Sequence, residues 1–296
     1  MILGVTQYRL PNRLGGQLSL NHYPCKEAKA SVLLLHGLGG TARQFGDHQQ
    51  GFINFCLAQG LEVFTLELHG HGQSWPSVSS RTRYGINDVV EHDLALFMKH
   101  IDRLAADVPR FLVGQGFAGV LWLAYMARFP DAKVQGMLHL GWLGSSSNLP
   151  TPSALFHRLR LSVLAPIFGR VLGYLPAWLM GRGSAEALDL FKQAQSWMRG
   201  QWCDPKDEFP YWQRLSELSL PPSLYVTDGG EHARIRTARQ MMRNLGQHDC
   251  CLLVLDQKSR KGVAQLEGSL QTPEFADNFY PILSTWFGTH LTATEI

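Results

Sequence analysis

The 296-residue chain has little net charge, few cysteines and no long apolar run. Its 27 Lys and Arg residues nearly balance its 24 Asp and Glu residues, which leaves a formal charge of +3. No basic run is interleaved with aromatic residues, so the sequence offers no basis for expecting nucleic acid as a partner. The five cysteines are odd in number and include no Cys-x-x-Cys pair, which argues against a metal knuckle or a redox motif.

Targeting and membrane-spanning segments are also missing from the sequence. No segment approaches the ~18 uninterrupted apolar residues of a transmembrane helix. Residues 1–5 lack a charged region followed by a long apolar stretch, which a signal peptide would need. We therefore expect no stable membrane insertion and a cytoplasmic location. His69 and His71 have no further ligand at metal-binding spacing, so we expect no metal and no cofactor.

Short strands alternate with amphipathic helical patterns over most of the chain, which predicts an α/β fold with a mostly parallel sheet. The predicted strands are 6–10, 17–23, 31–35, 61–66, 110–113, 134–140, 222–227 and 250–255. The predicted helices are 48–59, 86–106, 117–129, 232–245 and 274–287.

Residues 145–220 differ from the rest of the chain, because they carry no clean strand and their apolar helical stretches are broken by prolines. This pattern predicts a helical insertion. The predicted organisation is a core of residues 1–144 and 221–296 with an insertion at 145–220.

Three glycine-rich turns follow predicted strands. They are His-Gly-Leu-Gly-Gly at 36–40, His-Gly-His-Gly-Gln-Ser at 69–74 and Gly-Gln-Gly-Phe-Ala-Gly at 114–119. In this order and at these separations they resemble the α/β-hydrolase superfamily, and most closely its branch of monoacylglycerol lipases, lysophospholipases and serine aminopeptidases. The resemblance implies one α/β-hydrolase domain with a helical cap (lid) over an apolar pocket. The ligand site of such a sheet lies at the carboxyl ends of the strands.

The resemblance also locates the positions of a Ser-Asp-His triad, and this chain departs from it at all three. Gly116 stands where the family has its nucleophilic serine, and glycine has no side chain to attack a carbonyl. His232 stands at the acid position, with Asp228 and Glu231 as acidic alternatives close to it in the sequence, and Arg260 or Lys261 fills the histidine position. We therefore assign no catalytic residue, and whether any activity remains is left open.

Although the triad residues are replaced, the backbone N–H groups of the first and third turns lead us to predict a binding site there. The resemblance implies an oxyanion loop at Gly37 and Leu38, and the Phe117 N–H opens a helix whose dipole favours a negative charge. Arg260 or Lys261 would add positive charge, and His139 is the histidine expected to line the pocket. His71 and Ser74 are expected to support the second turn. The leading hypothesis is a non-hydrolytic binder of a small, partly apolar ligand, either acyl-containing or with an anionic or carbonyl group.

Other interpretations stay open. One is an active esterase, lipase-like hydrolase or lyase with a relocated catalytic apparatus that uses His139 or His232. Another is a protein-interaction scaffold in which Gly116 relieves strain over a collapsed pocket. The Gly-x-Gly-x-x-Gly match at 114–119 would need an acidic residue ~20 positions later to bind a dinucleotide, and the next strand ends without one. The oligomeric state is not indicated.

Overall fold

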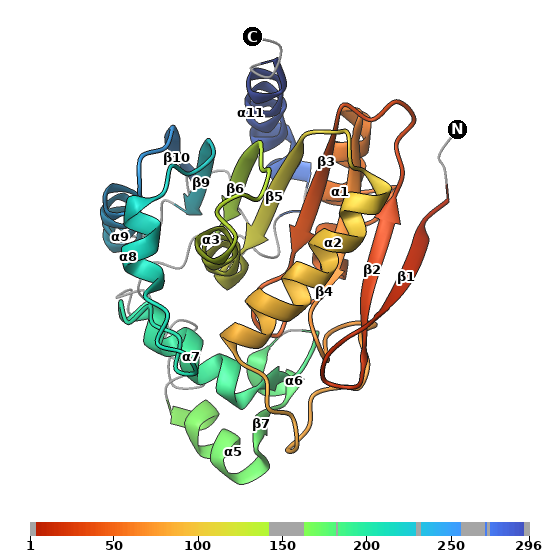
Figure 1. Ribbon diagram of the computed structural model, residues 1–296. Coiled ribbons are helices and arrows are strands. Elements are labelled where there is room, and N and C mark those ends of the chain that lie inside the picture. Colours follow the sequence, from red (N-terminus) through yellow and green to blue (C-terminus); the bar gives the residue numbers. More distant parts are fainter. Residues whose placement is uncertain are drawn as a thin grey trace.

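The computed structural model describes residues 4–141, 163–181, 183–228, 232–255, 270 and 273–292. Its centre is an eight-stranded sheet in the order β1-β2-β4-β3-β5-β6-β9-β10 (Figure 1). The strands are β1 (Thr6–Pro11), β2 (Gln17–Tyr23), β3 (Ala30–Leu35), β4 (Leu61–Glu67), β5 (Arg110–Gln115), β6 (Gly136–Leu140), β9 (Ser223–Asp228) and β10 (Cys250–Leu255). All eight predicted strands are confirmed to within two residues at each end.

The sheet is parallel from β4 to β10 and antiparallel where β1 and β2 join it. Every residue of β3, β4 and β5 is buried. Helices cover both faces of a parallel sheet, so its strands can be apolar throughout rather than alternating with polar residues. This explains why the run at 31–35 carries no polar alternation.

Two cores lie on the two faces of the sheet. Leu33 and Leu35 of β3 belong to one core and Val32 and Leu34 to the other, as the period of two in a strand requires. The first core is covered by the π-helical η2 (Asp88–Leu94), α2 (Ala95–Leu104), α3 (Phe117–Arg128), α8 (Tyr211–Glu217) and α9 (His232–Asn244). The second core is covered by α1 (Gly51–Ala58) and α11 (Pro273–Thr292).

The predicted helices differ from the observed ones mainly at their ends. The helix predicted at 86–106 is π-helical over its first part and becomes an α-helix only at Ala95. The last helix continues to Thr292, beyond its predicted end at 287.

The described part of the helical insertion follows β6 and precedes β9 in the chain, and most of it lies below the sheet in Figure 1. It contains α5 (Ala165–Leu172), β7 (Tyr174–Leu175), α6 (Ala177–Met180), β8 (Glu186–Ala187), α7 (Leu188–Met198) and α8. The sequence predicts no clean strand here, whereas β7 and β8, of two residues each, form a short antiparallel pair. Residues 145–162 lie outside the described residues, so the predicted start of the insertion remains a prediction.

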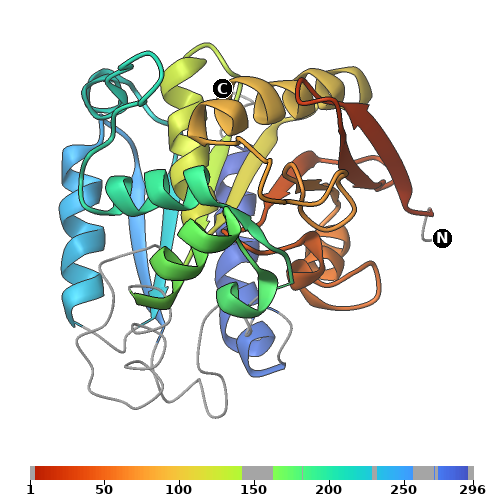
Figure 2. The ribbon, with the colours of Figure 1, turned by 90° about the horizontal axis from the view of Figure 1, so that it is seen from below.

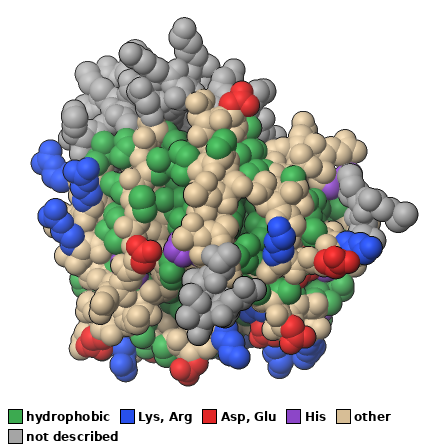
Figure 3. Space-filling model, turned by 90° about the horizontal axis from the view of Figure 1, so that it is seen from above, with side chains coloured by type: hydrophobic (Ala, Val, Ile, Leu, Met, Phe, Trp, Pro, Cys, Tyr) green, Lys and Arg blue, Asp and Glu red, His purple; other side chains and the backbone are tan. Residues whose placement is uncertain are grey.

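Charged side chains lie mostly at the surface. On the face turned away from the insertion, basic and acidic side chains lie mostly toward the edge of the view, in places next to one another, and hydrophobic side chains are spread between them (Figure 3). Arg236, Arg239 and Arg243 of α9 are all exposed. Within the described residues, no helix combines the length and the apolar character needed to cross a membrane.

Candidate functional site

The third glycine-rich turn is a sharp strand-to-helix elbow. Gly116 lies between the end of β5 and the start of α3 with φ +57° and ψ −122°, and its N–H donates to the Leu140 carbonyl at 2.8 Å. A positive φ favours glycine, which has no Cβ to clash with the backbone. A Cβ on Gly114 would lie 2.4 Å from the Gly119 nitrogen, so the strand and the helix approach closely here. The glycine spacing at 114–119 therefore has a packing explanation that requires no nucleotide.

The first glycine-rich turn is fixed by a buried histidine. The His36 Nε2 accepts a hydrogen bond from the Leu68 N–H at 3.2 Å, so its Nδ1 carries the proton and faces the Gly37 carbonyl at 2.9 Å. The ring therefore joins the loop at 36–40 to the loop that follows β4. Leu38, the expected oxyanion donor, is partly buried and packs against the core next to α3 and against the apolar cluster of the insertion.

An unpredicted carboxylate from the insertion binds both of these loops. The Glu186 Oε2 accepts the Gly39 N–H at 2.8 Å and lies 3.3 Å from the His71 Nε2, and both side chains are fully buried. The His71 Nδ1 faces the His69 carbonyl at 3.0 Å, so a doubly protonated ring satisfies both acceptors. Burial opposes the charge, but the Glu186 carboxylate and the His69 carbonyl together raise the pKa of His71. We call this pair the Glu186–His71 junction.

The second glycine-rich turn, at 69–74, rests on hydrogen bonds from neighbouring elements. The Ser74 hydroxyl donates to the Glu67 carbonyl at 2.6 Å and accepts from the Ser19 N–H at 2.8 Å, in line with the supporting role expected for it. The Asp93 Oδ2 accepts the His69 N–H at 3.1 Å and the Tyr84 hydroxyl at 2.5 Å. Burial raises the pKa of the Asp93 carboxyl to about 7 despite these two hydrogen bonds.

His139 lies within the sheet rather than at an open site. Its ring is 1% exposed and stacks on Tyr225 with a centroid distance of 4.5 Å. Burial, together with the charge of His248, lowers the pKa of His139 to about 3. A ring with so low a pKa is neutral at physiological pH and is a weak general base. His139 is not among the described residues that line the cavity beside the elbow.

The structure contains a cavity of about 320 Å³ beside the elbow, between α3, α7, α8 and α9. Four aromatic side chains form much of its wall, namely Phe117, Trp197, Trp202 and Trp212. Phe117 is the residue that follows Gly116, so the cavity adjoins the elbow. We call this space the aromatic cavity.

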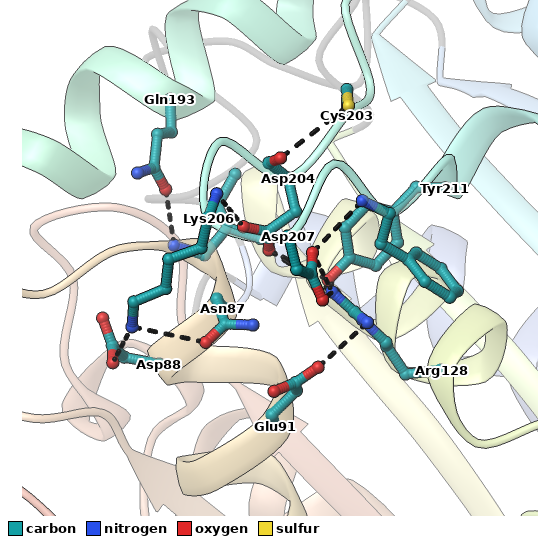
Figure 4. A network of polar contacts seen from close by, with 12 residues as sticks. Asn87, Asp88, Glu91, Arg128, Gln193, Cys203, Asp204, Lys206, Asp207 and Tyr211 are labelled. Carbon is teal, nitrogen blue, oxygen red and sulfur yellow. Dashed lines mark hydrogen bonds and ion pairs between the residues drawn. The ribbon is translucent and has the colours of Figure 1, made fainter.

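A second polar network attaches the insertion to the core at the far end of α3 (Figure 4). Arg128 reaches Glu91 at 3.0 Å, Asp207 at 2.7 Å and the Tyr211 hydroxyl at 3.0 Å. The buried Asp204 lies 3.6 Å from the same guanidinium. This Arg128 network involves carboxylates from η2 and from the segment before α8.

Three residues that the sequence analysis assigns to the site, Arg260, Lys261 and His232, have no described side chain. Arg260 and Lys261 lie outside the described residues. His232 is the first residue of α9, but its side chain is not described. Their expected roles therefore remain predictions. In the part of the chain that the structure describes, no group of three or more His, Cys, Asp and Glu side chains is placed to hold a metal ion.

Known proteins support the fold that these elements build. The model of the family described as serine aminopeptidase, S33 (Hydrolase_4) matches residues 26–180, just over half of the chain. No curated protein matches the sequence.

Solved structures resemble the chain over nearly its whole length. A monoacylglycerol lipase of Paleococcus ferrophilus has a TM-score of 0.63 and 16% identity, covering 92% of this chain and 99% of its own. A soluble variant of the monoglyceride lipase of Saccharomyces cerevisiae, in complex with a substrate analog, has a TM-score of 0.66 and 15% identity, covering 98% and 95%. At these identities the likeness establishes a common fold, which is the predicted α/β-hydrolase fold.

Proposed function

This chain belongs to the serine aminopeptidase S33 family of α/β-hydrolase-fold proteins, and we propose that it binds a small, partly apolar ligand without hydrolysing it. The observation that carries the proposal is Gly116. The elbow keeps its sharp turn, with φ +57°, but the residue at its apex has no hydroxyl or thiol. A covalent acyl transfer needs such a nucleophile, whereas a binding site does not.

The ligand would use backbone donors and apolar walls. The Leu38 and Phe117 N–H groups would hold a carbonyl or anionic group, with Gly37 and Gly116 giving it close access to the backbone. The aromatic cavity beside Phe117 would accept the apolar part. The solved monoglyceride lipase that resembles this chain holds a substrate analog, which is consistent with an acyl-containing ligand here.

The surroundings of this site are part of the same proposal. The helical insertion would act as its lid, because Glu186 ties it to the loop at 36–40. Arg260 or Lys261 would add positive charge at the histidine position. We also propose that the protein is located in the cytoplasm.

Hydrolysis of short- and medium-chain nitrophenyl esters by the purified protein tests the proposal. We expect no rate above buffer and no covalent labelling by an organophosphonate, because no nucleophile is present at the elbow. A known esterase in the same assay is the positive control.

The same assay on two histidine variants tests the alternative of a relocated catalytic apparatus. If the wild type turns esters over and either His139→Ala or His232→Ala loses the rate, the chain is an active enzyme and the proposal is wrong. The low pKa of His139, about 3, counts against it as the base.

A further inference from the structure

The aromatic cavity is formed by elements that are far apart in the sequence. Phe117 comes from α3, Trp197 from α7, Trp212 from α8 and Met241 from α9. Of these helices, α7 and α8 belong to the insertion and α3 and α9 to the core, and all four gather at one side of the sheet (Figures 1 and 2). Its volume of about 320 Å³ is at the lower end of the ~300–1,000 Å³ found for ligand pockets.

The tryptophan wall is rigid and presents apolar surface. Trp197 and Trp202 stack with a centroid distance of 5.2 Å and are 2% and 6% exposed. The Trp202 Nε1–H donates to the Trp197 carbonyl at 2.7 Å, and the Trp197 Nε1–H donates to the Cys203 carbonyl at 3.2 Å. Both indole N–H groups are therefore engaged by the backbone. A planar ring entering the cavity would meet ring faces and edges that are already in place, at little cost in side-chain entropy.

The rim of the cavity supplies polar groups but no charge. Gln240 and Asn244 lie four residues apart on α9, and residues at this spacing share one face of a helix. Their amides can both donate and accept hydrogen bonds. Among the described residues of the wall none is charged, so a ligand charge buried here would have no partner and would be costly.

We propose that the aromatic cavity binds a neutral compound with a planar ring and one carbonyl, amide or hydroxyl group. The ring would lie among the tryptophans and the polar group would face Gln240 and Asn244. This inference rests on the proposed function, since Phe117 contributes its ring to the cavity and its N–H to the elbow. It restricts the partly apolar ligand of that proposal to a neutral compound with an aromatic ring, and it places the ligand's polar group at Gln240 and Asn244 instead of at the elbow.

Isothermal titration calorimetry with three small probes tests the ligand class. Naphthaleneacetamide is neutral and aromatic, naphthaleneacetate is its charged counterpart, and octanamide is a neutral compound without a ring. We expect naphthaleneacetamide to bind ~10-fold more tightly than either of the others, from ring contacts and from the absence of a buried charge. No binding of naphthaleneacetamide, or tighter binding of either of the other probes, overturns the inference.

Two variant pairs locate the binding. Met241→Trp fills the cavity and should weaken naphthaleneacetamide binding ~10-fold or more, whereas Arg243→Trp, on the exposed face of the same helix, should leave it unchanged. Gln240→Leu, at an exposed rim position that does not threaten folding, should weaken it several-fold. Gln213→Leu, exposed on α8 outside the cavity wall, is its control. Unchanged binding in both cavity variants overturns the inference.

The two proposals fail in different ways in these experiments. Ester turnover by the wild type would contradict the proposed function, whatever the probes do. Binding of octanamide or naphthaleneacetate that ignores Met241→Trp would leave a ligand-binding function standing and would overturn the assignment of the aromatic cavity.

Discussion

Two of the junctions that hold the helical insertion to the core differ in how their charges are placed. At the Glu186–His71 junction one carboxylate and one imidazole are fully buried, and the carboxylate also holds the Gly39 N–H. In the Arg128 network one guanidinium, whose side chain is 11% exposed, shares several partners, of which Asp207 is 44% exposed. The Glu186–His71 junction is therefore a single buried pair, which we call the concentrated junction. The Arg128 network is spread over several partners and is partly exposed to solvent, and we call it the distributed network.

This difference indicates which junction matters more for the site. A buried charge that loses its only partner cannot be rehydrated without opening the fold. A partly exposed carboxylate that loses an arginine can turn to water, so much of its interaction is replaced. The concentrated junction also touches the loop that carries Leu38, so its loss should disturb the proposed ligand site as well as stability.

The largest effect is expected from Glu186→Ala. It leaves His71 and the Gly39 N–H buried without this carboxylate, and we expect the free energy of unfolding to fall by about 3–5 kcal/mol. Urea denaturation followed by far-ultraviolet circular dichroism measures the change. Glu217→Ala is the matched control, because the Glu217 side chain is 54% exposed and should change stability little. A loss no larger than that of the control would mean that the junction is not a stabilising contact.

A smaller effect is expected from Arg128→Ala. Only Asp204 among its carboxylate partners is fully buried, so we expect a loss of about 1.5–3 kcal/mol in the same urea experiment. Arg214→Ala, at a side chain that is 59% exposed, is the control. If Arg128→Ala destabilises the protein more than Glu186→Ala, the distributed network is the stronger attachment and the comparison is reversed.

The smallest effect is a difference in how the two junctions respond to pH. Because the folded-state pKa of His71 is raised, its contribution is fully present below the usual value of 6.5 and is lost as the pH rises through the folded-state pKa. Burial raises the pKa of Asp207, but Arg128 lowers it overall, so that contribution is present above 3.8 and is lost as the pH falls. We therefore expect the first junction to weaken in alkali and the second in acid.

Urea denaturation of the wild type and of Glu186→Gln over a pH series measures the alkaline response. The glutamine keeps the shape of the side chain and removes its charge, so the stability gap between the two proteins should narrow as the pH rises above 6.5. Asp93, whose pKa of about 7 also makes stability fall with rising pH, is present in both proteins. A gap that widens toward alkaline pH would contradict a protonated His71.

The strands and turns of the fold could be predicted from the sequence because short runs of neighbouring residues mark them. Buried strands are marked by apolar runs such as 31–35, and the turns that follow them are marked by glycine. At Gly116 a positive φ favours glycine, and at Gly114 the approach of α3 leaves no room for a side chain. The elbow was therefore predicted at the right residue, and its missing side chain could be read directly from the sequence.

The contacts of the site depend on packing between distant segments and could not be predicted from the sequence. Glu186 lies 115 residues from His71 and belongs to no motif, so nothing near it in the sequence indicates that it reaches the loop at 36–40. His139 stands near the end of its strand, as expected of a pocket residue, yet the register of β6 beside β9 stacks it on Tyr225. The turns and strands could be predicted from the sequence alone, because backbone geometry depends on neighbouring residues. The Glu186–His71 junction and the aromatic cavity depend instead on how segments that are distant in the sequence pack together.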